Sequence, residues 1–548
     1  MLSTQFLLNR GNQLIYEYDI VLSVRVWHSN KMIVEIIIFL LTTLLIYFIY
    51  VHKWIHKYFD KRDIKYVPGV PIFGNTFKST FAFKHIVEDI DAVYKAFPNE
   101  KYVGYIEGST PIIMVRDPEL IKAITVKDFD HFVDHKVFFS EPLFDDSLLM
   151  MKGERWHDMR TTLSPAFTSS KMRKMMPFMT DISANIIEYL QDHVNEDIDV
   201  EDLMRRYTND VIASAAFGLQ VNSVKDKDNE FYKSGQNLFH FNVYQRFIFF
   251  MSATFPKVTK KLGIEIFPAK TTNFFRNLVS STMEYREKNK IERPDMIQLL
   301  MEASKGSLKV ENEENDQVSI TEDTFKPKSV QRKWTQNELA GQVFIFFFAG
   351  YESSAIALVM CVHELAINPD IQEKLYQEIR KFKEKYGDLT YENINHLKYL
   401  DCVLNESSRK WPAALMDRVC NTPYELPPPR EGAKPVQLKP GDIVYNVLNS
   451  IHMDPAHHPD PEKFNPDRFS DENKHNIKPF TYMPFGVGPR NCIGSRFALL
   501  EVKVLVYNLI LNFKVVKCSK TIDPIELIPR GFNIKPKGGS WVRLEPRV

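Results

Sequence analysis

A long apolar run marks the N-terminal part of the chain. Residues 32–51 form 20 consecutive positions with a single charge, Glu35. A helix of this length can cross a bilayer, and no small-residue cleavage site follows that would make the run a signal peptide. Basic residues crowd its C-terminal side: Lys53, Lys57, Lys61, Arg62 and Lys65. The pattern therefore predicts a transmembrane signal anchor over residues 32–52 with the following chain in the cytosol; a buried helix of a soluble protein is the alternative.

The pattern changes on both sides of this run. Residues 1–31 show neither a helical nor a strand period, so they form a leader that is either a true extension or lies before a start at Met32. Residues 53–75 are first basic and then rich in proline and glycine. Proline fixes φ and is excluded from helix interiors, so we expect a stiff hinge there. Residues 76–548 are expected to form the folded domain.

Helical periods dominate the rest of the chain, and one strand pair stands out. Residues 102–115 alternate and carry β-branched side chains, which predicts a hairpin. Residues 497–513 show the period of a helix. Residues 239–267 are dense in aromatic side chains, which is typical of a buried core. The charged stretch 305–332 holds too little apolar surface to order itself, so we expect a flexible connection.

A second apolar run is predicted to be a core helix. Thr335 and Glu338 form a capping-box pattern, and the helix that they start runs to about Asn368. Its first turns are apolar on every side, so it lies either in lipid or in the protein interior. In lipid, Glu352 would lie near the bilayer centre at a cost of about 2.5–3.5 kcal/mol, which favours the interior. Gly350 weakens the helix by about 1 kcal/mol relative to alanine and is expected to open a groove.

Charge and cysteine content exclude several classes of function. The chain has 70 lysine and arginine residues against 69 aspartate and glutamate residues, so no basic excess points to nucleic acid. Its five cysteines include no Cys-x-x-Cys pair, which argues against zinc sites, iron–sulfur clusters and a disulfide framework. We therefore expect no nucleic-acid partner and a chain built for a reducing compartment.

One cysteine lies in a setting suited to metal ligation. Cys492 stands at the mouth of the helix predicted from residue 497, where the positive end of the helix dipole favours the thiolate that ligates iron. Gly486 and Gly488 can take positive φ and bring backbone amides close to the sulfur. Arg490 supplies a forked cation of the kind that pairs with a carboxylate. The alternative is an ordinary buried thiol.

The segment from Phe485 to Gly494 resembles the haem-binding signature of the cytochrome P450 haem-thiolate monooxygenases, and the resemblance extends from about Tyr66 to the C-terminus. It implies a mainly α-helical, triangular haem domain with a small β region, preceded by the transmembrane anchor. It also implies haem b (iron protoporphyrin IX), with Cys492 as the axial ligand of the iron. Further residues are expected to contact this cofactor: Arg490 at a propionate, Phe485, Gly486 and Gly494 in the loop, and Trp156 and Arg160, which share one helical face and contact the propionates.

The core helix carries the motif that serves oxygen binding and proton delivery in this family. The positions that match it are Ala349, Gly350, Glu352 and Ser353. Serine stands where the family commonly has threonine, which keeps the hydroxyl donor and loses the methyl group.

A charge network is the third motif that the resemblance identifies. Glu406 and Arg409 lie three residues apart on a predicted helix, and the family joins this pair to a later arginine, here Arg468, in a buried network. An isolated pair of this kind is usually solvated and contributes little, so its place before Cys492 carries the identification.

The resemblance implies a monooxygenase that inserts one oxygen atom of dioxygen into lipophilic small molecules. Its electrons come from NADPH through a membrane-bound flavoprotein reductase, with a cytochrome b-type donor as a second source. The C-terminal motifs and the Asp134–His135 segment are most similar to the microsomal, xenobiotic-metabolising group of insects. We therefore expect detoxification at the endoplasmic reticulum membrane, with the catalytic domain on the cytosolic side. The alternatives are a haem-thiolate isomerase or dehydratase that needs no reductase, and a non-enzymatic haem sensor or carrier.

Overall fold

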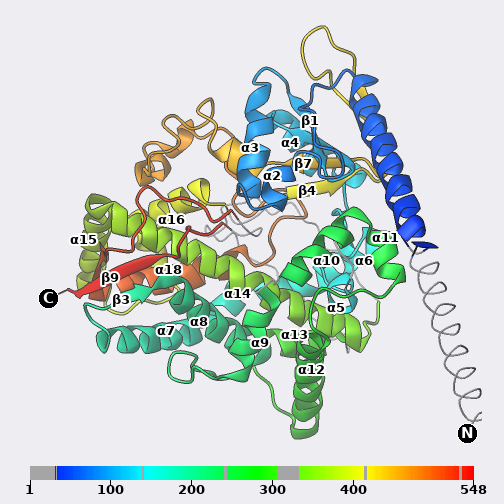
Figure 1. The fold of residues 1–548 in the computed structure, drawn as a ribbon. Coiled ribbons are helices and arrows are strands. Elements are labelled where there is room, and N and C mark those ends of the chain that lie inside the picture. The colour runs from blue at the N-terminus through cyan, green and yellow to red at the C-terminus, as the bar shows by residue number, and fades with distance from the viewer. Residues whose placement is uncertain are drawn as a thin grey trace, which may run out of the picture.

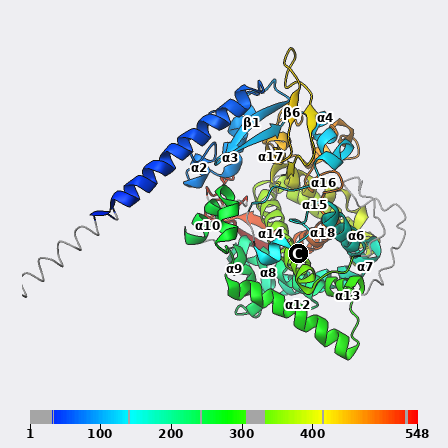
Figure 2. The ribbon, with the colours of Figure 1, turned by 90° about the vertical axis from the view of Figure 1, so that its right-hand side faces the viewer.

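The computed structural model describes residues 31–32, 34–138, 141–239, 243–304, 332–412, 416–529 and 534–547. These residues form a body of helices with small sheets, and the N-terminal helix projects from it (Figures 1 and 2). The predicted leader and the predicted charged connection lie outside the described residues, apart from Lys31 and Arg332. The mainly α-helical fold class is confirmed.

Most of the chain folds into α-helices of 4 to 32 residues, linked by short 3₁₀ and π turns. Their bounds are α2 Phe77–Thr80, α3 Ile86–Ala96, α4 Pro118–Lys122, α5 Pro142–Asp145, α6 Gly153–Leu163, α7 Ser169–Gln191, α8 Val200–Ile212, α9 Glu230–Phe239, α10 Val243–Thr254, α11 Pro256–Lys261, α12 Ala269–Asn289, α13 Met296–Ser304, α14 Gln336–Ile367, α15 Pro369–Tyr386, α16 Lys398–Lys410, α17 Leu448–His452 and α18 Ser495–Asn512. The helix predicted over residues 497–513 is thus confirmed as α18.

The strands form three small sheets. The first has the order β1-β2-β7-β4, and β1 pairs antiparallel with β2, so the predicted hairpin is confirmed. The second has the order β3-β9-β8, and β5 pairs with β6 in the third. The bounds are β1 Tyr102–Glu107, β2 Thr110–Val115, β3 Asp197–Asp199, β4 Met416–Val419, β5 Tyr424–Leu426, β6 Val436–Leu438, β7 Ile443–Asn446, β8 Phe513–Lys517 and β9 Trp541–Pro546.

Helix α14 lies in the middle of the domain (Figure 1). Its capping box is confirmed, because the Thr335 hydroxyl accepts from the N–H of Glu338 while the Glu338 carboxylate accepts from the N–H of Thr335. Helices α8 and α18 pack against it, and side chains such as Leu358 and Met360 are fully buried. The prediction that this apolar run is a core helix is confirmed.

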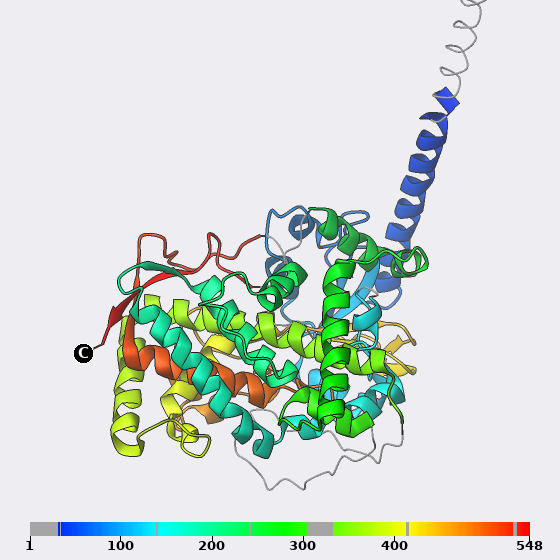
Figure 3. The ribbon, with the colours of Figure 1, turned by 90° about the horizontal axis from the view of Figure 1, so that it is seen from below.

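The N-terminal helix runs from Val34 to Asp60 and is long and apolar enough to cross a membrane. Its first part stands clear of the domain (Figure 3). Its last turns belong to the fold, because Ile55 and Phe59 are buried in the core beside the first sheet. The helix is therefore longer than the predicted anchor, and the basic start of the predicted hinge is helical. Apolar side chains at a spacing of four residues give those turns a face to bury.

Candidate functional site

Cys492 lies in a tightly turned loop that leads into α18. The backbone N–H of Gly486 donates to the Met483 carbonyl at 3.0 Å, and the N–H of Cys492 donates to the Phe485 carbonyl at 2.8 Å. Gly486 and Gly488 have φ of 74° and 77°, so the positive φ predicted for both is confirmed. A Cβ at Gly488 would overlap a neighbouring backbone carbonyl, which makes glycine necessary there. The loop thus fixes the cysteine through its own backbone.

The Cys492 thiol faces an open space within the fold. Its side chain is exposed, yet the protein atoms around it raise its pKa, a combination not expected on the outer surface. The backbone N–H of Gly494 and the cation of Arg160 act in the opposite direction. The Gly494 N–H at the helix mouth thus acts in the direction that the sequence predicted, toward the thiolate, but in the protein alone burial outweighs it and the pKa is raised. A metal cation would reverse the balance, since it deprotonates a coordinating thiol.

The middle of α14 presents a bare face although most of the helix is buried. Ala349 and Ser353, four residues apart and so on the same side, are exposed, and Phe346 on that side is only partly buried. The centre of the Phe346 ring lies 5.4 Å from that of Phe167, and a Cβ at Gly494 would lie 3.6 Å from the Phe167 ring. One aromatic side chain therefore bridges this face and the cysteine loop. The exposed face of α14 and the cysteine loop therefore lie near each other.

The helix around Ser353 is a regular α-helix without a break. The Ser353 hydroxyl donates to the carbonyl of Ala349 at 2.6 Å. Helix α14 is α-helical without interruption, so the opening predicted at Gly350 is absent. A Cβ at Gly350 would lie 3.0 Å from Cδ1 of Ile212 on α8. Close packing of α8 against α14 therefore accounts for this glycine.

Glu352 has other surroundings than its neighbour Ser353. Its carboxylate accepts hydrogen bonds from Arg205 at 2.9 and 3.1 Å and lies 2.9 Å from Nζ of Lys535. Burial acts to raise the pKa of Glu352, but these two cations outweigh it and the pKa is lowered. The predicted acid and hydroxyl are thus adjacent in sequence, with the acid buried in an ion network and the hydroxyl exposed.

Two arginines that the sequence singled out lie against the cysteine loop. Arg160 on α6 donates to the backbone oxygen of Asn491 at 2.9 Å and to its side-chain oxygen at 2.7 Å, so it contacts the residue next to Cys492. The Arg490 guanidinium lies over the ring of Trp156, 4.4 Å from the ring centre. It also donates to four backbone carbonyls, those of Val133, Leu148, Leu149 and Met151. The structure thus brings Trp156, Arg160 and Arg490 together beside the loop.

Arg418 on β4 is a site residue that the sequence analysis missed. It is fully buried and donates from Nη1 to the Asp417 carbonyl at 2.7 Å, while its Nε and Nη2 have no hydrogen-bond partner in the described part of the chain. The Asp417 carboxylate accepts instead from His135 and from the N–H of Lys136. Burial lowers the pKa of Arg418 to about 10, and burial together with the nearby Arg418 lowers the pKa of Arg490. A buried guanidinium with two unpartnered nitrogens fits an anionic group such as a carboxylate of a bound cofactor. A lone arginine in a short strand carries no local pattern that would have revealed it.

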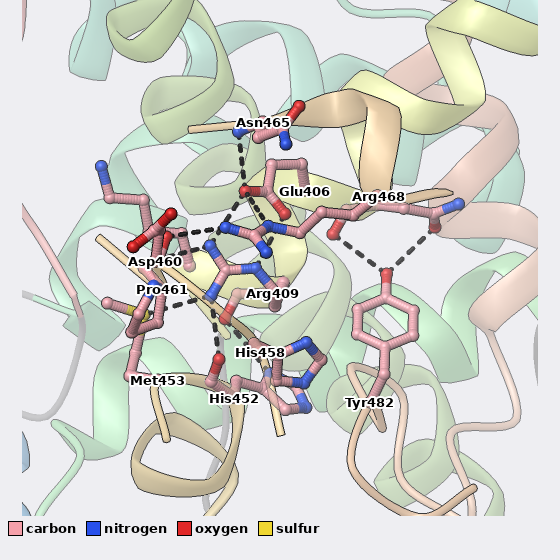
Figure 4. Close-up of polar contacts among 12 residues, drawn as sticks. Glu406, Arg409, His452, Met453, His458, Asp460, Pro461, Asn465, Arg468 and Tyr482 are labelled. Atoms are coloured by element: carbon pink, nitrogen blue, oxygen red, sulfur yellow. Dashed lines mark hydrogen bonds and ion pairs between the residues drawn. The ribbon is translucent and has the colours of Figure 1, made fainter. Parts of the chain in front are cut away.

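Glu406 and Arg409 form a fully buried ion pair on α16 (Figure 4). Nε and Nη2 of Arg409 donate to the Glu406 carboxylate at 2.7 and 2.9 Å. The guanidinium also donates to the carbonyls of His452 and Pro461, at 2.8 and 2.7 Å. Nε of Arg468 lies 3.4 Å from the same carboxylate. The structure therefore joins all three predicted residues of the charge network.

All of the comparisons with known proteins match one protein family. A model of the cytochrome P450 family matches residues 65–543. The chain is 41% identical to cytochrome P450 9e2 of Blattella germanica over 517 residues, which is 90% of this chain and 95% of that protein. It is 42% identical to probable cytochrome P450 9f2 of Drosophila melanogaster, again over 90% of this chain and 95% of that protein. Cytochrome P450 6k1 of Blattella germanica is 33% identical over 88% of this chain and 91% of its own length.

Proposed function

The chain belongs to the cytochrome P450 family, and we propose that it detoxifies lipophilic foreign compounds by inserting one oxygen atom of dioxygen into them. As a member of that family it is a monooxygenase that uses haem iron, a redox partner and lipophilic substrates. We infer that its cofactor is haem b and that its electrons come from NADPH through a membrane-bound flavoprotein reductase, with a cytochrome b-type donor as a second source.

The space between the cysteine loop and α14 is the proposed haem site. When bound, the haem supplies an iron centre that activates dioxygen, and a thiolate ligand favours this chemistry. Cys492 would ligate the iron, and Phe485, Gly486 and Gly494 would border the macrocycle. The arginines Arg160, Arg418 and Arg490, with Trp156 beside them, would face the carboxylates of the haem. The observation that carries the proposal is an exposed thiol together with a buried arginine, Arg418, whose Nε and Nη2 have no hydrogen-bond partner among the described residues.

Ser353 is the residue that would deliver a proton into this space. A dry apolar pocket supplies no protons, so a hydroxyl on the exposed face of α14 is needed to relay them. Rotation about the Cα–Cβ bond would turn the Ser353 hydroxyl from the Ala349 carbonyl toward the open space. Because its pKa is lowered, Glu352 carries no proton at neutral pH in the described arrangement. Glu352 would accept and pass on a proton only after Arg205 or Lys535 releases its carboxylate.

The N-terminal helix would hold the domain at the endoplasmic reticulum membrane. Its exposed apolar length and the basic residues on its C-terminal side support an anchor with the catalytic domain in the cytosol. That orientation gives the domain access to a reductase anchored in the same membrane and to substrates dissolved in it.

The proposed function is tested by following the origin of the inserted oxygen. The full chain, purified with haem and combined with an NADPH-dependent flavoprotein reductase, would be given a panel of lipophilic compounds under isotopically labelled dioxygen. We expect products that carry one labelled oxygen atom and that require NADPH. Products formed without NADPH and without label would indicate an isomerase or dehydratase. Tight haem binding with no product from any compound would favour a sensor or carrier.

A further inference from the structure

His452, the last residue of α17, lies between the buried ion pair and the start of the cysteine loop. Its Nδ1 is 3.2 Å from the carbonyl oxygen of Arg409, and its Nε2 is 2.9 Å from the backbone nitrogen of Met483. A carbonyl can only accept a hydrogen bond and a backbone N–H can only donate one. His452 therefore has its proton on Nδ1, and its Nε2 is the acceptor.

These contacts extend into a chain of hydrogen bonds that reaches the cysteine. The Met483 N–H donates to His452, and the carbonyl of Met483 accepts from the N–H of Gly486 at 3.0 Å. The carbonyl of Phe485, between them, accepts from the N–H of Cys492 at 2.8 Å. On the other side, the carbonyl of His452 accepts from the Arg409 guanidinium (Figure 4). One side chain thus connects the ion pair with the backbone turn that orients Cys492.

Only a neutral imidazole can make both contacts. A proton on Nε2 would abolish the acceptor for Met483 and add a charge beside Arg409. Burial, His458 and Arg409 together lower the pKa of His452 to about 3, which keeps the ring neutral. His458 lies opposite His452 in the loop after α17, and its Nε2 donates to the Thr481 carbonyl at 3.0 Å. A second histidine thus binds the backbone just before the cysteine loop.

We propose that His452 is a positioning residue for Cys492. By accepting from the Met483 N–H it fixes the first turn of the cysteine loop relative to the Glu406–Arg409 pair. The loop then presents the sulfur in one orientation toward the iron. This inference rests on the proposed role of Cys492 as the haem ligand, and it assigns to His452 a part in ligation that goes beyond filling the core.

Two substitutions separate the two hydrogen bonds of His452. Asparagine places its amide at the level of Nδ1, so His452→Asn keeps a donor for the Arg409 carbonyl and loses the acceptor for Met483. Glutamine places its amide oxygen at the level of Nε2, so His452→Gln keeps the acceptor for Met483. The matched control is His363→Asn. His363 is also fully buried and has two hydrogen-bond partners, Ser540 and the Ile522 carbonyl, away from the cysteine loop.

The haem-loaded full chain would be examined by backbone hydrogen exchange and by the spectrum of the ferrous–CO form. In His452→Asn the Met483 N–H loses its acceptor. Loss of one hydrogen bond corresponds to about a tenfold change in an equilibrium constant, so we expect about tenfold faster exchange at this N–H. The same variant should convert a large part of the thiolate-type Soret band to the type seen without thiolate ligation. His452→Gln should retain most of the thiolate-type band. His363→Asn should retain all of it, even if its melting temperature falls as much as that of His452→Asn.

Unchanged exchange at Met483 and an unchanged spectrum in His452→Asn would overturn the proposal. Equal spectral loss in the asparagine and glutamine variants, or in the His363 control, would reduce His452 to a structural residue and overturn it as well. These outcomes differ from a failure of the proposed function itself. If Cys492 is not the ligand, the unmodified protein either has no thiolate-type band or keeps that band in Cys492→Ala.

Discussion

Replacing Arg418 with methionine should have opposite effects on the haem-free and haem-loaded protein. Arg418 is buried, and two of its guanidinium nitrogens have no hydrogen-bond partner among the residues that the structure describes. Leaving a buried donor unpaired costs about 1–3 kcal/mol, and a neutral hydrogen bond such as that from Nη1 to the Asp417 carbonyl contributes about 0.5–1.5 kcal/mol. Two unpaired nitrogens cost about 2–6 kcal/mol, and subtracting that bond leaves a net penalty of about 0.5–5.5 kcal/mol. Arg418→Met, similar in length and apolar, should therefore stabilise the haem-free fold by about this amount.

The haem-loaded protein should respond in the other direction. If the free nitrogens of Arg418 donate to a propionate, Arg418→Met removes a charge-assisted hydrogen bond of about 1.5–3 kcal/mol. That free energy corresponds to about 10- to 150-fold weaker haem binding. Haem affinity is measured by the rate at which haem transfers to an excess of a haem-free globin, and the stability of the haem-free fold is measured by thermal unfolding of protein expressed without haem.

Arg409→Met is the matched control, because Arg409 is equally buried but fully paired with Glu406. Breaking such a pair costs about 3–5 kcal/mol, so this variant should be less stable with and without haem. The reasoning is refuted if Arg418→Met destabilises the haem-free protein as Arg409→Met does while haem transfer stays at the unmodified rate.

Three further predictions follow from the site, the anchor and the buried histidines. Ser353→Ala should keep haem binding and NADPH consumption while product per NADPH falls and hydrogen peroxide rises; Ser353→Thr should restore coupling, and unchanged coupling in the alanine variant would exclude Ser353 as the proton donor. Deleting residues 1–52 should weaken flotation with vesicles and retain haem, whereas deleting residues 1–60 should also lower the melting temperature, because the last turns of the helix are buried; equal melting temperatures would contradict this. The pKa values of His452 and His458 are lowered to about 3 and 4, so between about pH 6.5 and pH 5 it is almost entirely the unfolded chain that takes up their protons. Stability should be full above pH 6.5 and fall by about 2 kcal/mol per histidine by pH 5, and a thermal-unfolding profile that is flat across this range would disprove the shifts.

The sequence was enough to predict which helices carry the site, but not which neighbours surround the side chains on those helices. Apolar pattern and a capping box were enough to predict α14, because both signals are local. The pattern could not show that Glu352 is buried between Arg205 and Lys535, because those cations come from distant parts of the chain. It also attributed Gly350 to a groove, whereas the contact with α8 that explains this glycine depends on how two helices pack.

Residues within a recognisable motif were found, and isolated ones were not. Cys492, Arg490 and the Glu406–Arg409 pair stand in dense patterns of fixed spacing. Arg418 and His452 have no such neighbours in sequence, and their importance comes from burial and from partners that only the fold brings near. The helical start of the predicted hinge was missed for the same reason, since its buried face exists only beside the first sheet.

The ferrous–CO spectrum of Cys492→Ala tests the central claim most directly. Cys492 is one of five free cysteines, and Cys518, which is partly exposed, serves as the control in Cys518→Ala. The account predicts that Cys492→Ala shows no Soret band of the thiolate-ligated type, while Cys518→Ala shows the full band. A Cys492→Ala protein that keeps the band would place the iron ligand elsewhere and contradict the account.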